Sequence, residues 1–177
     1  MDRINKWYKR VLINELIYKQ VPKNSYKIPK LNKITLKSSF NSVTEDPKNI
    51  VFSYVVLEII AKQKPKICLA TKSISSFKLQ KNTPLACKQT LRKIKKDLLL
   101  NLLITVVLPR VQNFSPLEIS KNGVLNIGLK QLSLFPQLAN KYEQIPRDLG
   151  LTVTFDNSRI KQKDFRLLLT GFQLPIQ

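Results

Sequence analysis

The chain has 177 residues, of which 43% are hydrophobic, so it is long and apolar enough to bury a core rather than remain disordered. Lysine and arginine total 31 against 11 acidic residues, giving a formal net charge of +20 and a pI near 10.2. A compact domain with this charge repels itself unless a polyanion neutralises it, which makes nucleic acid the first candidate partner and an anionic membrane surface the second. Histidine is absent, which excludes the commonest general bases and most zinc sites.

The N-terminal segment carries apolar residues at helical spacing. This pattern predicts an amphipathic helix over residues 4–20 that ends before Pro22. Trp7 and Tyr8 are expected to pack this helix against the fold rather than to contact RNA. Residues 21–30, with two prolines, indicate a loop.

The next segment, residues 31–37, alternates in the way that is typical of a strand. One face combines an apolar residue with polar and basic ones, which favours a sheet with a polar, ligand-facing surface; a merely solvated strand face is the alternative. That face carries Leu31, Lys33, Thr35 and Lys37.

Asp46 and Pro47 together are a good helix start, with Asp46 as N-cap. The helix that follows, to about Lys62, is apolar on nearly every face. We therefore expect it to be a central core element.

The stretch 62–96 contains eleven basic residues and no acidic one. Short apolar alternations interrupt the charges and predict a basic hairpin over 62–92, with strands near 65–70 and 85–91 and a tip around 73–84. Cys68 and Cys87 are expected to be small buried hydrophobic residues without a disulfide. Phe77, in the tip, is expected to pack within its own hairpin, with stacking on a nucleotide as the alternative.

The C-terminal half continues with a helix over 92–108 that Pro109 is expected to end. Its first turn is basic (Arg92, Lys93, Lys95, Lys96), which is unfavourable at the positive end of a helix dipole and suggests a bound anion. Further expected elements are a strand within 124–135, a polar loop over 137–148, a strand over 151–155, and a helix over 163–172 ending at Gly171. The chain is therefore predicted to be α+β: a single domain, residues 1–177, with a mostly antiparallel sheet packed against helices and a protruding basic hairpin loop.

Several function classes fit poorly. No apolar run reaches the length of a membrane span, the acidic residues are scattered without paired spacing, and four glycines cannot build a phosphate-binding loop alongside the turns. We therefore expect no enzymatic activity, no cofactor and no metal site. A structural RNA-binding protein is the favoured class; a basic peripheral membrane-surface protein or another RNA-binding protein is the alternative.

The order of several motifs resembles one family over nearly the whole chain. These motifs are IPKLNKITLK (28–37), QKP (63–65), KS-x-x-x-FK (72–78), CKQTLR (87–92), LPRVQNF (108–114), NIGLKQLSLFP (126–136) and LTGFQLP (169–175). They resemble the universal ribosomal large-subunit protein five family, of the bacterial or organellar type. The resemblance implies an antiparallel sheet on helices, no enzymatic activity, and a surface for 5S rRNA in the central protuberance.

Carried over motif by motif, the resemblance implies three sets of site residues. The rRNA-binding set is Lys33, Thr35, Lys37, Gln63, Lys64, Lys66, Lys88, Thr90 and Arg92. The loop near P-site tRNA is Lys72, Ser73, Ser75, Ser76, Phe77, Lys78 and Lys81. The bridge face toward the small subunit is Arg110, Gln112, Asn113 and Gln137. The chain departs from the family in placing Lys37 where asparagine is usual, Ser75-Ser76 where Ala-Gly is common, and Gln137 where an acid is common.

The partners that this resemblance implies are 5S rRNA, large-subunit rRNA, P-site tRNA, the neighbouring large-subunit protein eighteen and small-subunit protein thirteen, with no membrane. The lack of a presequence and the Lys-, Asn- and Ile-rich composition favour a mitochondrial ribosome in the matrix. A plastid or a bacterial cytoplasm is the alternative.

Overall fold

The computed structural model describes residues 3–39, 49–77, 79–112, 114–120, 123–139, 149–156 and 162–176. Five strands form one sheet in the order β2-β3-β1-β5-β4. They are β1 (Lys33–Ser39), β2 (Lys66–Leu69), β3 (Pro84–Leu91), β4 (Val124–Leu129) and β5 (Gly150–Asp156). The predicted α+β class with an antiparallel sheet is confirmed.

The chain comprises two compact units, which are described separately below. Unit 1 is Met1–Ile34, Leu91–Ile127 and Thr154–Gln177; unit 2 is Thr35–Thr90 and Gly128–Val153. The interpretation of residues 1–177 as a single domain stays a prediction.

In unit 1, the predicted N-terminal helix is confirmed. It consists of α1 (Arg3–Trp7), a wider π-helical segment η1 (Tyr8–Leu12) and α2 (Ile13–Gln20), which follow one another directly. Ile4, Leu12 and Leu16 are its buried residues, at the spacing that the sequence pattern indicated. The helix ends at Val21, whose backbone adopts the left-handed conformation (φ 43°) and whose N–H donates to the carbonyl of Ile17 at 2.9 Å.

The second long helix of unit 1 consists of α4 (Lys93–Leu102), the π-helical η4 (Leu103–Val107) and α5 (Leu108–Arg110). The prediction that Pro109 ends this helix is wrong, because the helix continues to Arg110. Pro109 lies in the first turn of α5, directly after the wider π turn, where a missing N–H and a bulky ring are best tolerated. The helix α1 packs against α4, and α2 packs against the C-terminal helix α6 (Gln162–Gly171), whose prediction is confirmed.

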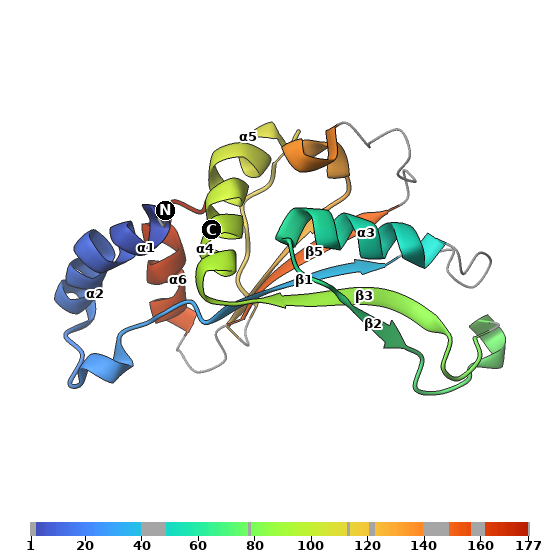
Figure 1. Cartoon of the computed structure of the whole chain (residues 1–177). Helices are drawn as coiled ribbons and strands as arrows, with labels where there is room; N and C mark the ends of the chain where they lie inside the picture. Colours follow the sequence, from blue (N-terminus) through green and yellow to red (C-terminus); the bar gives the residue numbers. More distant parts are fainter. Residues whose placement is uncertain are drawn as a thin grey trace. The chain divides into compact units, whose positions relative to one another are not determined.

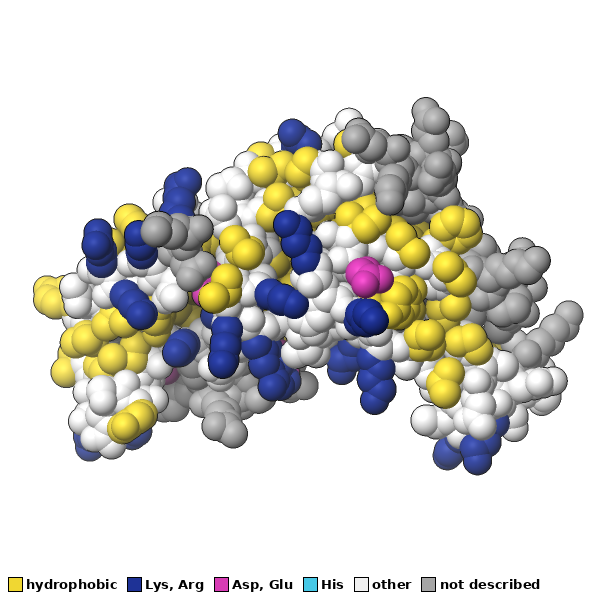
Figure 2. All heavy atoms as spheres, in the orientation of Figure 1, with side chains coloured by type: hydrophobic (Ala, Val, Ile, Leu, Met, Phe, Trp, Pro, Cys, Tyr) yellow, Lys and Arg dark blue, Asp and Glu magenta, His cyan; other side chains and the backbone are white. Residues whose placement is uncertain are grey.

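In unit 2, α3 (Asn49–Ala61) lies against one face of the strands (Figure 1). The thiol of Cys87 on β3 donates to the carbonyl of Ile50 on α3 at 3.9 Å, which identifies the face that the helix covers. The expectation that α3 is buried all round is wrong, because Val51 and Val55 are 60% and 42% exposed. A helix that lies on a sheet buries only one side, and Figure 2 shows exposed hydrophobic side chains over α3. The predicted start at Asp46 and Pro47 lies outside the described residues.

The basic hairpin of unit 2 is confirmed, since β2 and β3 pair antiparallel. Its tip contains a one-turn helix, η3 (Ser75–Phe77), closed by a β-bridge between Ile74 and Leu79. The strand expected within 124–135 ends at Leu129, and residues 132–134 form a 3₁₀ turn (η5) that buries leucines on alternate positions without strand pairing. The loop expected over 137–148 is described only as far as residue 139.

Candidate nucleic-acid interface

The two faces of β3 differ in character. Cys87 and Gln89 are buried on the side covered by α3, whereas Lys88 between them is exposed. Because side chains alternate along a strand, Lys88 and Thr90 project from the open face of the sheet. Figure 2 shows basic side chains along the lower border of the view, beneath the strands.

The hairpin register places Lys66 on β2 directly opposite Lys88 on β3. Both side chains are exposed. Like charges at directly opposed positions destabilise a sheet. A bound anion would remove this repulsion, so the pair is a local signature of phosphate binding.

The QKP turn connects α3 to β2 and is held by hydrogen bonds to β3. Lys62 ends α3 in the left-handed conformation (φ 50°), with its N–H donating to the carbonyl of Glu58 at 2.8 Å. The side-chain amide of Gln63 then donates to the carbonyl of Thr90 at 3.4 Å, and the amide of Gln89 donates to the carbonyl of Gln63. The structure therefore brings Gln63 and Thr90 together, as the motifs implied, but it uses the Gln63 amide to position the turn.

Gln89 is a residue that the sequence analysis missed. It is 2% exposed and has the inward position between Cys87 and Leu91 in an otherwise apolar alternation. A buried amide needs hydrogen-bond partners, so a glutamine at that phase of a strand was the available signal.

The remaining predicted rRNA contacts of unit 2 differ in accessibility. Lys37 and Lys64 are exposed, as a phosphate contact requires. Thr35 is only 6% exposed. It lies on β1, which has β3 and β5 on its two sides, and a short side chain on a central strand is covered by its longer neighbours.

Lys33 and Arg92 belong to unit 1. The ammonium group of Lys33 forms an ion pair with Asp156 on β5 at 2.8 Å, so a protein carboxylate already offsets part of its charge. Arg92 is exposed at the N-cap of α4 and makes no side-chain capping hydrogen bond.

One basic residue of the first turn of α4 has a structural role instead of the expected anion contact. Lys96 is buried; its ammonium donates to the carbonyl of Leu31 at 2.8 Å and pairs with Asp97 at 3.0 Å. The helical period turns this side chain toward the core, while Lys93 and Lys95 remain exposed.

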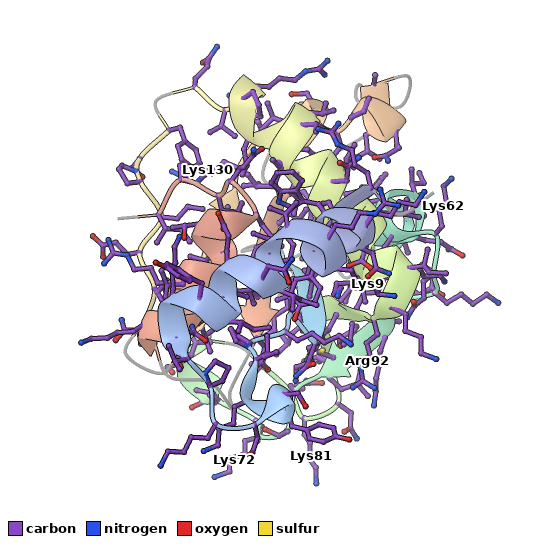
Figure 3. The ribbon with its side chains drawn as sticks, turned by 90° about the vertical axis from the view of Figure 1, so that its left-hand side faces the viewer. Lys9, Lys62, Lys72, Lys81, Arg92 and Lys130 are labelled. Carbon is purple, nitrogen blue, oxygen red and sulfur yellow. The ribbon has the colours of Figure 1, made fainter. Side chains whose placement is uncertain are left out.

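The hairpin tip is exposed and basic. Lys72 and Lys81 project from the same end of the hairpin (Figure 3). Ser73, Ser75 and Ser76 are also exposed, and Lys78 lies outside the described residues. The expectation that Phe77 packs within the hairpin is wrong, because its side chain is 70% exposed: the short helix η3 points it outward.

The base of the tip is fixed by backbone hydrogen bonds. Ala70 N–H donates to the carbonyl of Thr83 at 2.8 Å, and Asn82 N–H donates to the carbonyl of Ala70 at 3.0 Å. Asn82 adopts a positive φ of 68°, which asparagine tolerates better than most residues. The tip is therefore a held projection at which side chains can meet a partner.

The predicted bridge residues are exposed wherever the structure describes them. Arg110 ends α5 and Gln112 follows it in unit 1, while Gln137 belongs to unit 2. Asn113 lies outside the described residues.

Both cysteines are free thiols. Cys87 is buried as expected, whereas Cys68 is half-buried, because it pairs with Ala86 and so shares the open face with Lys66. Burial raises the pKa of the Cys87 thiol, and the nearby Cys68 adds to the shift. Tyr8, in unit 1, donates its hydroxyl to the carbonyl of Pro29 at 2.9 Å, and burial raises its pKa.

The charge of unit 2 is one-sided. Among its described residues Glu58 is the only acid, against Lys37, Lys62, Lys64, Lys66, Lys72, Lys81, Lys88 and Lys130. Within the described part of the chain, His, Cys, Asp and Glu side chains form no cluster of three or more that could hold a metal. None of the described helices is long and apolar enough to cross a membrane.

Comparison with known proteins identifies the family. The model for ribosomal protein L5 matches residues 24–80, and the model for the C-terminus of that ribosomal family matches residues 84–176. The large ribosomal subunit protein uL5m of Reclinomonas americana is 33% identical, over 99% of this chain and 98% of its own length. The large ribosomal subunit proteins uL5 of Nitrosomonas europaea and Neisseria meningitidis are each 32% identical, over 100% of this chain and 99% of theirs. The chain therefore belongs to the ribosomal L5 family.

Proposed function

We propose that the chain is a structural constituent of the large ribosomal subunit and binds 5S rRNA in the central protuberance. Its interface is the open face of β1, β2 and β3 in unit 2, together with the QKP turn. The opposed pair Lys66 and Lys88 is the observation that carries this assignment, because the free protein holds two like charges at a position that only an anion makes favourable. The family and the names of the relatives support the ribosomal role and argue against an enzyme.

The chemistry of the interface suits folded RNA. Proteins contact A-form RNA through phosphates and 2′-hydroxyls over the shallow groove, or through splayed loop bases. Exposed Lys37, Lys64, Lys66 and Lys88 supply phosphate contacts, and Thr90 supplies a hydroxyl of fixed position between them. Lys33 and Arg92 add to the local potential from unit 1. Thr35 contributes only where the backbone of the RNA comes close to β1.

The hairpin tip is proposed to contact P-site tRNA. Lys72 and Lys81 give it positive charge, and exposed Phe77 offers a flat surface on which a nucleotide can stack. Because hydrogen bonds hold the base of the tip, the contact needs little ordering on binding.

Further contacts follow from the place of the family in the subunit. Arg110, Gln112, Asn113 and Gln137 are proposed to take part in the bridge to small-subunit protein thirteen, and large-subunit protein eighteen and large-subunit rRNA are proposed neighbours. A mitochondrial ribosome is the proposed location, supported by the match to uL5m; equally full-length matches to bacterial uL5 keep the bacterial alternative open.

Cys68 provides a direct test of the interface, because it lies on the open face beside Lys66 while Cys87 is buried on the other face. The full chain is alkylated with iodoacetamide, with and without saturating 5S rRNA, and the two cysteine peptides are quantified by mass spectrometry. We expect 5S rRNA to slow alkylation of Cys68 several-fold, and an unrelated RNA of similar length to do so only at low salt. An unchanged Cys68 rate at saturation would place the RNA elsewhere.

A further inference from the structure

A cavity of about 460 Å³ lies in unit 1, where α1 and η1 face α4 and η4. Its walls include Trp7 and Val11 from the N-terminal helix and Ile104 from η4. This volume is within the roughly 300–1,000 Å³ of small-molecule sites. None of the functional residues assigned above lines it.

The rim of the cavity is cationic. Arg3, Lys6 and Arg10 recur at the spacing that places residues on one side of a helix, and all three line the opening. None of the described lining residues is acidic. An occupant of this cavity therefore carries negative charge.

One wall of the cavity is a held aromatic ring. Trp7 is 44% exposed, so the expectation that it simply packs into the fold is incomplete. Its indole N–H donates to the carbonyl of Gly171 at 3.2 Å, which fixes the ring. Phe172 lies behind it, buried, and stacks on Tyr8 with ring centroids 6.1 Å apart.

Polar groups complete the lining. Asn101, Thr105 and Gln173 offer amide and hydroxyl groups at the cavity wall, and the Thr105 hydroxyl is oriented by donating to the Asn101 carbonyl at 2.8 Å. Such groups can pair with the edge of a base.

We propose that this cavity binds one unstacked nucleotide of single-stranded ribosomal RNA, with the base against Trp7 and the flanking phosphates on Arg3 and Arg10. The proposal rests on the proposed ribosomal function for the identity of the RNA, but it concerns unit 1 and not the sheet face of unit 2. The acidic segment of a protein would satisfy the same charges. A flat ring beside fixed amides favours a base, because every base has a face that stacks on an aromatic side chain.

Trp7 is the only tryptophan of the chain, so intrinsic fluorescence reports on this cavity alone. The full chain is titrated with penta-adenylate RNA, and with hexaglutamate as a charge control. We expect saturable quenching by the RNA and little by the peptide. An equal response to hexaglutamate, or no response to the RNA, would overturn the proposal.

Two neighbouring substitutions give a matched comparison. Arg10→Gln removes a charge from the rim, whereas Lys9→Gln removes the same charge from a residue that lines a different hollow of unit 1 (Lys9 is labelled in Figure 3). At about 0.1 M salt the first should weaken quenching roughly fivefold, the value of about one phosphate contact, and the second much less. Equal losses would contradict the proposal. Circular dichroism melts confirm that both variants are folded.

The sheet-face variant Lys66→Gln/Lys88→Gln separates this proposal from the proposed function. If the cavity binds RNA independently, this double variant loses affinity for 5S rRNA and retains the quenching of Trp7 by penta-adenylate. If wild-type protein binds 5S rRNA with no change at Trp7, the cavity proposal fails and the proposed function stands. If quenching occurs without specific 5S rRNA binding, the reverse holds.

Discussion

Replacing Lys66 and Lys88 together by glutamine should stabilise the free protein while weakening its complex with RNA. Directly opposed residues of an antiparallel pair have Cβ atoms about 4.5–5.5 Å apart, and two unit charges about 5 Å apart in water repel by roughly 0.8 kcal/mol. Exposed lysines can turn away from each other, so we expect a gain of about 0.2–1 kcal/mol in the free energy of unfolding. For a chain of this length, that is roughly 1–4 °C in Tm.

The effect on RNA binding has the opposite sign and is larger. Each neutralised phosphate contributes about 0.7–0.9 to the slope of log K against log salt. Losing two such contacts should lower the slope by about 1.4–1.8, which at 0.15 M salt corresponds to a loss of roughly 15- to 30-fold, or about 1.6–2.0 kcal/mol.

Filter binding to 5S rRNA between 50 and 400 mM salt measures the slope, and thermal melts of the free proteins measure stability. The matched control is Lys19→Gln/Lys163→Gln, which removes the same charge from exposed positions on α2 and α6. The reasoning is refuted if the Lys66/Lys88 variant and the control lose the same slope, or if the Lys66/Lys88 variant melts lower than wild type.

Three further outcomes follow from single residues. Thr90→Val should weaken 5S rRNA binding by up to about tenfold with no change in salt slope, since a hydroxyl contributes a hydrogen bond and no counterion release; filter binding checks both quantities. Val21→Gly should raise the free energy of unfolding by about 1 kcal/mol in urea titrations, because Val21 is 79% exposed and a β-branched residue is strained at φ 43°; a decrease would contradict this. The raised pKa of Tyr8 means that the unfolded state loses this proton first, so its stabilisation is complete below pH 10 and declines as the pH rises above that value. The urea midpoint of Tyr8→Phe should therefore fall less between pH 9 and pH 11 than that of wild type.

The sequence predicted the fold well where a single periodicity decides the outcome. The hairpin is such a case, because the apolar positions before and after a Ser- and Asn-containing turn allow one register, and that register places Lys66 opposite Lys88. The N-terminal helix is another, since its buried Leu12 and Leu16 follow the helical spacing directly.

The errors arise where tertiary context decides. An apolar helix gives no sign of how many of its sides will be covered, so the exposure of Val51 and Val55 on α3 could not be read from the sequence. Lys96 looks like its basic neighbours, and only its phase on α4 relative to the core makes it a buried donor to Leu31. The exposure of Phe77 depends on a one-turn helix in the tip that no periodicity predicts.

The distribution of acids explains why RNA is needed at one unit in particular. The two ion pairs that the structure defines, Lys33 with Asp156 and Lys96 with Asp97, both lie in unit 1. In the described part of unit 2, Glu58 stands alone against eight lysines, and its strands oppose two of these directly. Protein carboxylates thus offset cationic charge in unit 1, whereas the sheet face of unit 2 keeps a surplus that costs stability in the free protein. Such a surplus is compatible with a stable fold only if phosphates supply the missing charge, and this is why the open face of β2 and β3, rather than the more numerous basic residues elsewhere, is the surface on which the 5S rRNA assignment depends.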